Sequence, residues 1–142
     1  MFSREESKKI RKEFWTSFGK QSPKKWILYD TKIKEINLKF HFDTKKASVG
    51  IIIDTEDELI KEYYFEKFES LKNLLLSEVD KDFILDPNFE TESGKIIGNI
   101  YLPKENVSIH NKKTWPEVFE FFNTKMLSLE QFFIEYYHII KQ

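Results

Sequence analysis

Residues 36–53 alternate between apolar and polar side chains, and this alternation constrains the fold more than any other feature of the chain. Such a pattern is typical of β-strands with one buried face. The first apolar series is Ile36, Leu38, Phe40 and Phe42, and the second is Ala47, Val49, Ile51 and Ile53. The Asp-Thr-Lys-Lys segment between them predicts a turn, so the two series form an antiparallel hairpin. Ile52 indicates that part of the opposite face is covered as well.

Three segments carry the N-terminal capping signature of a helix, a Ser or Thr followed by Glu at the third position. The signatures are Ser3 with Glu6, Thr55 with Glu58, and Thr114 with Glu117. Each precedes apolar residues at helical spacing. They predict helices from Ser3 to Gly19, from Thr55 to about Val79, and from Thr114 onwards with Pro116 in the first turn. The buried stripe of the last helix comprises Val118, Phe122, Met126, Leu129, Phe133 and Ile140. We expect Gly19 to adopt a left-handed C-terminal conformation, and residues 21–23 to form a turn.

Four shorter segments have the composition of strands: 26–29, 83–85, 95–102 and 107–109. No repeat and no low-complexity linker divides the chain. We therefore predict one α+β domain over residues 1–142, in the order helix, antiparallel meander, helix, two strands, helix. Its sheet is mostly antiparallel and packed by helices.

The composition favours a packed aromatic core and excludes several classes of site. The chain has 14 Phe but only 4 Gly and 4 Pro, and it has no Cys. Disulfides, thiolate zinc sites and cysteine nucleophiles are therefore excluded. His41, His110 and His138 are widely separated and form no His-x₃-His pair, so a metal site would have to consist mainly of carboxylates, and the sequence does not locate one. We therefore predict no metal site, no cofactor and no catalytic histidine. The chain lacks an apolar stretch that suits a signal peptide or a membrane span, which predicts a cytoplasmic protein without a membrane partner.

Charge is distributed unevenly along the chain. Residues 1–46 have 13 Lys and Arg against 6 Asp and Glu, a balance of +7, whereas residues 47–142 have 10 against 18, a balance of −8. This asymmetry has two interpretations: neutralisation within the fold, or attraction of a polyanion such as nucleic acid. For the second interpretation, the candidate phosphate-binding residues are Lys24, Lys25, Lys32, Lys34, Lys39, Lys45 and Lys46. A solvated sheet face with lysines that discourage edge pairing is the alternative.

No motif indicates an active enzyme, and the catalytic residue set is predicted to be empty. The predicted order of elements also occurs in Mg²⁺-dependent nucleases, which need an acid and a Glu-x-Lys triplet on adjacent central strands. The only such triplet, Glu6-Ser7-Lys8, lies in the first helix, and the acid–lysine pairs at Asp30 and Asp43 fall in predicted turns. A degenerate fold of this nuclease type is therefore the third hypothesis.

Tryptophans and paired tyrosines are candidates for ligand or partner contacts. Trp15, Trp26 and Trp115 suggest a pocket, although aromatic residues at helical spacing more often belong to a core. The candidate interface residues are Tyr63, Tyr64, Tyr136 and Tyr137. Because adjacent helical residues point in different directions, one tyrosine of each pair should lie near the surface and suit a homodimer contact.

Four segments, IRKEFWTSFG at residues 10–19, KKASV at 45–49, VSI at 107–109 and the Trp115-Pro116 pair, resemble the bacterial domain-of-unknown-function family 4268. That resemblance implies a bacterial cytoplasmic protein associated with nucleic-acid processing, since members occur alone or behind nuclease-like domains. It implies no catalytic residues. Members have an acid in the central strand where this chain has Ile52, which argues further against a metal role.

The combined expectation is a non-catalytic accessory or binding domain that associates with nucleic acid through its basic N-terminal third. The alternative is a protein-interaction module that forms a homodimer.

Overall fold

Two β-hairpins form one four-stranded antiparallel sheet in the computed structural model, in the order β1-β2-β4-β3. The structure describes residues 2–22 and 24–142. The strands are β1 (Ile36–Phe42), β2 (Lys46–Ile53), β3 (Ile84–Glu90) and β4 (Ile96–Glu105). The predicted hairpin of β1 and β2 is confirmed, with Phe42 paired to Ala47 and Ile36 paired to Ile53. The α+β class is confirmed too.

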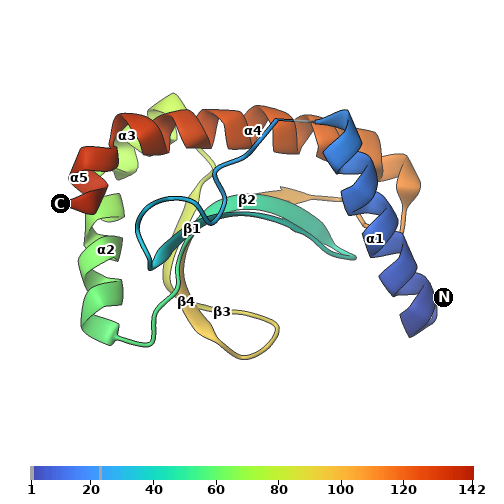
Figure 1. Ribbon diagram of the computed structural model, residues 1–142, viewed down its shortest axis with the longest axis horizontal. Coiled ribbons are helices and arrows are strands. Elements are labelled where there is room, and N and C mark those ends of the chain that lie inside the picture. The colour runs from blue at the N-terminus through green and yellow to red at the C-terminus, as the bar shows by residue number, and fades with distance from the viewer. Residues whose placement is uncertain (1, 23) are drawn as a thin grey trace.

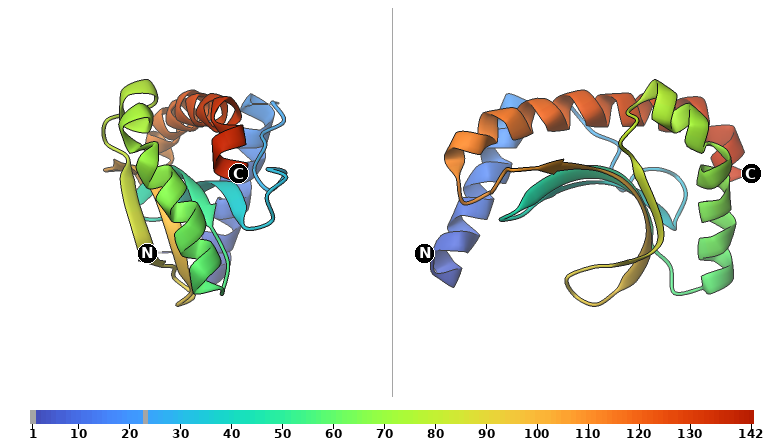
Figure 2. Two further views of the ribbon diagram at one scale, coloured as in Figure 1. Left: turned by 90° about the vertical axis from the view of Figure 1, so that its left-hand side faces the viewer. Right: turned by 180° about the vertical axis from the view of Figure 1, so that it is seen from behind.

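Helices surround this sheet on its apolar side. They are α1 (Arg4–Gln21), α2 (Glu58–Ser70), α3 (Lys72–Glu78), α4 (Trp115–Glu135) and α5 (Tyr137–Lys141), with a 3₁₀ turn at Lys112–Thr114. In Figure 1, α4 runs along the top while α1 and α2 descend at its two ends. The sheet curves beneath α4, and the β3–β4 hairpin bends away below it (Figure 2). Within the described residues, no helix is long and apolar enough to cross a membrane.

The core is built on contacts between aromatic rings of α1, α4 and the sheet. Phe14 is fully buried, and its ring centroid lies 4.8 Å from that of Phe42 and 5.2 Å from that of Trp115. Phe40 and Phe122 approach to 4.8 Å. Full burial of one such side chain contributes roughly 1.5–3 kcal/mol, so these rings are a main source of stability. The residues of the apolar stripe predicted for the last helix are all buried, but α4 ends at Glu135 and Ile140 lies in the separate helix α5.

Residues 26–29, predicted as a strand, form a loop that a buried glutamate holds in place. That prediction is wrong, because the segment is a loop in which Leu28 has a φ of 44°. Glu130 of α4 is 3% exposed; it accepts the Ile27 N–H at 2.6 Å and the Lys24 ammonium at 2.8 Å. Glu130 thus satisfies the Ile27 N–H, and the Leu28 carbonyl accepts one hydrogen bond from Leu38 of β1, so the segment lies beside the sheet without forming a strand. The predicted turn at 21–23 overlaps the end of α1, and Pro23 lies outside the described residues.

The helix boundaries differ from their predictions in four places. The capping box of Ser3 and Glu6 is confirmed, but α1 continues past Gly19 to Gln21. Asp57 rather than Thr55 caps α2, because its carboxylate accepts the N–H groups of Leu59 and Ile60. That helix ends at Ser70, and a separate short helix, α3, follows. The Thr114 hydroxyl donates to carbonyl oxygens of the preceding loop instead of capping α4. Neighbouring polar residues thus compete for the same backbone groups, and the residue that caps the helix is not always the one that the motif predicts.

Two strand predictions also change. The strand predicted at 83–85 runs instead from Ile84 to Glu90, with an irregularity between Asp86 and Phe89. It passes through Pro87, which an edge strand tolerates because one side needs no ladder hydrogen bond. The strand predicted at 95–102 is confirmed and extends to Glu105. Residues 107–109 form no strand; the Ile109 N–H donates to the Asp43 carbonyl instead.

Removal of the Glu130 carboxylate should loosen the 24–29 loop. We expect Glu130→Ala to lower the free energy of unfolding by about 2–3 kcal/mol, because the Ile27 N–H and the Lys24 ammonium lose their acceptor. Glu120→Ala, the same change at an exposed position of α4, should cost less than about 0.5 kcal/mol. Urea denaturation measures both. Equal effects of the two substitutions would show that Glu130 does not anchor the loop.

Two glycines should respond to alanine in opposite directions. Gly19 is helical, and nothing lies within 4 Å of the position of an added Cβ, so Gly19→Ala should stabilise by about 0.5–1 kcal/mol. At Gly50 of β2 an added Cβ would lie 2.9 Å from the Ile100 carbonyl oxygen. Gly50→Ala should therefore destabilise by about 1–3 kcal/mol. Thermal unfolding of both variants tests this; a destabilising Gly19→Ala would contradict the helical placement.

Candidate functional site

A groove of about 390 Å³ lies between the end of α1, the 24–29 loop and β1. We call it the aromatic groove. Its lining includes Trp15, Trp26, Tyr29 and Phe40 together with Lys24 and Lys39. The α1 helix contributes Trp15, the loop contributes Trp26 and Tyr29, and β1 contributes Phe40. Rings from three segments therefore meet at one surface.

The aromatic groove presents flat apolar faces beside positive charge. Trp15 is 36% exposed and Tyr29 is 75% exposed. Trp26 packs edge-on against Phe40 at 5.5 Å, and its Nε1 is buried without a hydrogen-bond partner among the described residues. The Lys24 ammonium lies 4.6 Å from the centre of the Trp26 ring. Such a surface can stack against planar rings and attract anionic groups.

A positively charged face of α1 adjoins this groove. Arg4, Lys8, Arg11 and Lys12 are exposed, and none makes an ion pair with any residue in 2–22 or 24–142. Helical spacing places Arg4, Lys8, Arg11 and Trp15 along one side of the helix, with Lys12 beside them. We call these four cations the basic face. Trp15 belongs to both features, so the basic face continues directly into the aromatic groove.

The seven lysines predicted to bind phosphate have different surroundings in the structure. Lys24 pairs with Glu130, and Lys32 pairs with Asp30 at 2.7 Å. Lys39 borders the aromatic groove and, with Lys46, a second groove described below. The remaining three, Lys25, Lys34 and Lys45, are exposed. The cations of the basic face were not among the predicted phosphate-binding residues, although their helical spacing is visible in the sequence.

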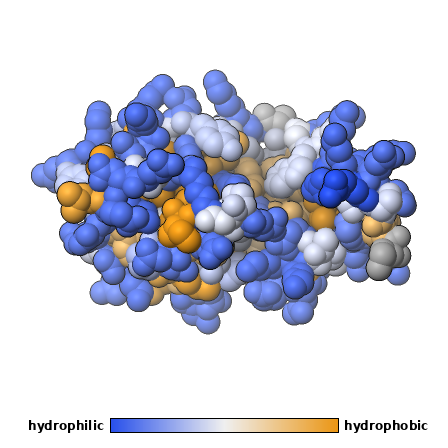
Figure 3. Space-filling view, turned by 90° about the horizontal axis from the view of Figure 1, so that it is seen from below, coloured by the Kyte–Doolittle hydropathy of each residue, from blue (hydrophilic) through white to orange (hydrophobic). Residues whose placement is uncertain are grey.

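The second groove, of about 570 Å³, lies on the polar side of the sheet. We call it the sheet groove. Its lining includes Lys39, His41, Ser48, Phe89, Asn99 and Tyr101. The turn between β3 and β4 closes one side of it, which explains the partial burial of Ile52. Seen from below the sheet, polar side chains predominate, with apolar ones in small groups (Figure 3).

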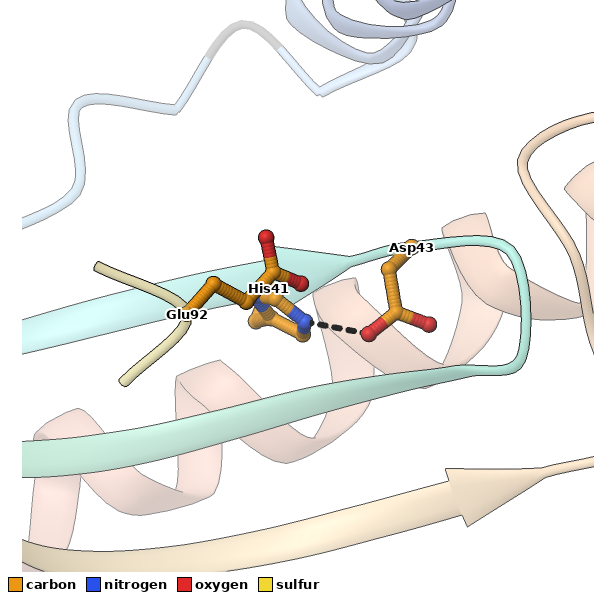
Figure 4. A group of neighbouring side chains, drawn as sticks. All are labelled: His41, Asp43 and Glu92. Atoms are coloured by element: carbon orange, nitrogen blue, oxygen red, sulfur yellow. Dashed lines mark hydrogen bonds and ion pairs between the residues drawn. The ribbon is translucent and has the colours of Figure 1, made fainter. Parts of the chain in front are cut away.

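Three potential metal ligands meet in the sheet groove. His41 comes from β1, Asp43 from the β1–β2 turn and Glu92 from the β3–β4 turn, as Figure 4 shows. One ligand atom of each lies within 4.8 Å of the others. His41 Nε2 and Asp43 Oδ2 are 2.8 Å apart. Partial burial acts to raise the pKa of the Asp43 carboxyl, but hydrogen bonds from His41, Lys45 and Lys46 outweigh it and hold the pKa below its usual value.

The turn position predicted for Asp43 is correct, whereas its proximity to Glu92 was not foreseen. No local pattern connects these two residues, because they lie in different hairpins. Only the bend that brings the β3–β4 turn toward the end of β1 places them together.

Of the four candidate interface tyrosines, only Tyr63 is mainly exposed, at 49%. Tyr64, Tyr136 and Tyr137 are half-buried at the end of the molecule where α2 meets α5. The Tyr136 hydroxyl donates to Glu78 at 2.5 Å, and this hydrogen bond raises the pKa of Tyr136 to about 12. Homodimer formation through these residues stays a prediction.

A comparison with protein families matches residues 10–137 to the family described as Domain of unknown function (DUF4268). The chain belongs to the DUF4268 family. The match includes all four segments that carry the resemblance. It also covers every lining residue of both grooves, so both belong to the DUF4268 domain itself. Arg4 and Lys8 of the basic face precede the match. Comparisons with curated proteins and with solved structures give no match.

The Tyr136–Glu78 contact predicts a titration that can be measured. In Glu78→Gln, the pKa of Tyr136 should fall from about 12 toward the ordinary tyrosine value of about 10, because the neighbouring carboxylate no longer disfavours the phenolate. Titration of ¹³C-labelled tyrosine rings by NMR, assigned with Tyr136→Phe, reports this value. Glu69→Gln, a substitution at an exposed position of α2, is the control and should leave the pKa of Tyr136 unchanged. An unchanged Tyr136 pKa in Glu78→Gln would contradict the contact.

Proposed function

We propose that this DUF4268 domain is a non-catalytic accessory domain that binds single-stranded nucleic acid. In this proposal, phosphates lie along the basic face of α1 and bases stack in the aromatic groove. The observation that carries it is the position of Trp15, which lies in line with Arg4, Lys8 and Arg11 and also lines the groove. Positive charge that leads into exposed aromatic rings is typical of surfaces that bind single strands.

The distribution of ion pairs supports a polyanion partner. If the basic N-terminal third were neutralised within the fold, its cations would pair with acids of residues 47–142. Among the described residues, only Lys24 with Glu130 forms such a pair. Glu13, one of the acids of α1, is itself paired with Lys112. The basic face therefore keeps its charge available for phosphates, whose neutralisation releases counterions.

The chemistry of the groove favours a single strand over a duplex. Bases in a duplex are stacked on one another, whereas an unpaired base has a free face for Trp15 or Tyr29. Stacking and phosphate contacts depend little on base identity, so we expect weak sequence preference. Rings and ammonium groups bind a strand without cleaving it, and this is the basis for the non-catalytic assignment.

Titration of a fluorescent oligothymidylate of about 20 nucleotides tests the proposal. Affinity should fall steeply between about 50 and 200 mM salt. The triple variant Lys8→Glu, Arg11→Glu, Lys12→Glu should bind at least about tenfold more weakly, with a salt slope shallower by about 2, since each single-strand phosphate contact contributes about 0.7. Tyr29→Ala, at a largely exposed position, should lower affinity by about 1–3 kcal/mol without changing the slope.

A charge-matched control is available at the far end of the molecule. Lys72, Lys81 and Lys141 are exposed there, in or next to α3 and α5 (Figure 1). Their combined reversal to Glu changes net charge by the same amount and should reduce affinity much less than the α1 variant. Equal losses in the two variants, tighter binding to duplex DNA, or no binding at about 50 mM salt would overturn the proposal.

A further inference from the structure

We infer that His41, Asp43 and Glu92 form a binding site for a divalent transition-metal ion in the sheet groove. The ligand atoms would be an imidazole nitrogen of His41 and one carboxylate oxygen each from Asp43 and Glu92; Nε2 is the nitrogen that contacts Asp43. The site lies on the polar side of the sheet and uses none of the residues of the basic face. It is therefore independent of the nucleic-acid proposal.

The three ligand atoms are close to the spacing that a metal requires. Zinc–ligand bonds of about 2.0–2.2 Å place the donors of a tetrahedral site about 3.4 Å apart. His41 Nε2 and Asp43 Oδ2 lie 2.8 Å apart, and all three donors lie within 4.8 Å of one another. Glu92 is exposed, so a change of its side-chain rotamer closes the remaining distance. A metal ion would replace the proton that joins His41 and Asp43.

Backbone contacts hold one ligand in place and leave another free. Asp43 Oδ1 accepts the N–H groups of Lys45 and Lys46 at 2.8 and 2.9 Å, so the other oxygen points toward His41. This is an outer set of hydrogen bonds of the kind that orients metal ligands. The Glu92 carboxylate makes no hydrogen bond or ion pair to any residue the structure describes. It reaches toward His41 from the β3–β4 turn (Figure 4).

One imidazole and two carboxylates favour Zn²⁺, Mn²⁺ or another first-row ion. Mg²⁺ and Ca²⁺ take oxygen ligands almost exclusively, so a histidine donor selects against them. Three protein ligands leave a further coordination position for water. Because the ligands come from both hairpins, the ion would also join the β1–β2 turn to the β3–β4 turn across the groove.

Calorimetric titration of the metal-stripped full chain with Zn²⁺ tests the site. We expect one ion per chain, binding at least about 100-fold more tightly than Mg²⁺. His41→Gln and Glu92→Gln should each weaken Zn²⁺ binding by about tenfold or more. Zinc should also shift the amide NMR signals of residues 41–46 and 91–95 and slow hydrogen exchange in the β3–β4 turn. Glu92→Gln should keep the fold, since that side chain is exposed.

Two matched substitutions distinguish this site from adventitious binding. Glu90→Gln changes a neighbouring acid that also lines the groove, and His138→Gln changes an exposed histidine of α5. Both should retain full Zn²⁺ affinity, as should the charge-reversed α1 variant. The inference is overturned if Zn²⁺ fails to bind at about 100 μM. It is also overturned if His41→Gln and Glu92→Gln bind as tightly as the wild type, or if the amide shifts occur elsewhere.

Discussion

Burial of the apolar face of the β1–β2 hairpin against α1 and α4 is the interaction on which the other features depend. Phe42 of β1 packs against Phe14 of α1, and Phe40 packs against Phe122 of α4, so two helices and a strand share one aromatic cluster. An antiparallel sheet packed on one side has a second face of different chemistry. The core therefore places the helices on the apolar face of the sheet, and the polar face stays accessible to other groups.

Both grooves arise at the margins of this core. The aromatic groove forms where the cluster reaches the surface beside α1, with Trp15 and Trp26 at its edge. The sheet groove forms on the opposite face, where the β3–β4 turn bends toward His41. Gly50 lies in its wall and allows β2 to approach Tyr101 of β4 closely. One apolar layer thus separates a surface suited to stacking from a surface suited to metal ligands.

The charge asymmetry along the chain survives folding, because few ion pairs join its basic N-terminal third to the acidic remainder. Among the described residues, only two ion pairs join residues 1–46 to residues 47–142: Lys24 with Glu130, and Glu13 with Lys112. The others, such as Lys32 with Asp30 and Lys125 with Asp80, lie within one of these two parts of the chain. Burial in α4 leaves the Glu130 carboxylate within reach of Lys24 and the Ile27 N–H. The pair therefore serves mainly to hold a loop against the core, while the cations of α1 stay solvated.

The sequence alone determined the secondary structure and the buried faces of the segments that have a long periodic pattern, namely the β1–β2 hairpin and α4. It also determined the Ser3 cap of α1, because that cap depends only on residues close in sequence. It also placed Asp43 in a turn. Only the tertiary structure decided that residues 26–29 are a loop, because Glu130 is distant in sequence. The same holds for the approach of Glu92 to His41. The local pattern of apolar residues specifies which face of an element is buried. Contacts between segments that are distant in sequence depend instead on how all the elements pack in the core.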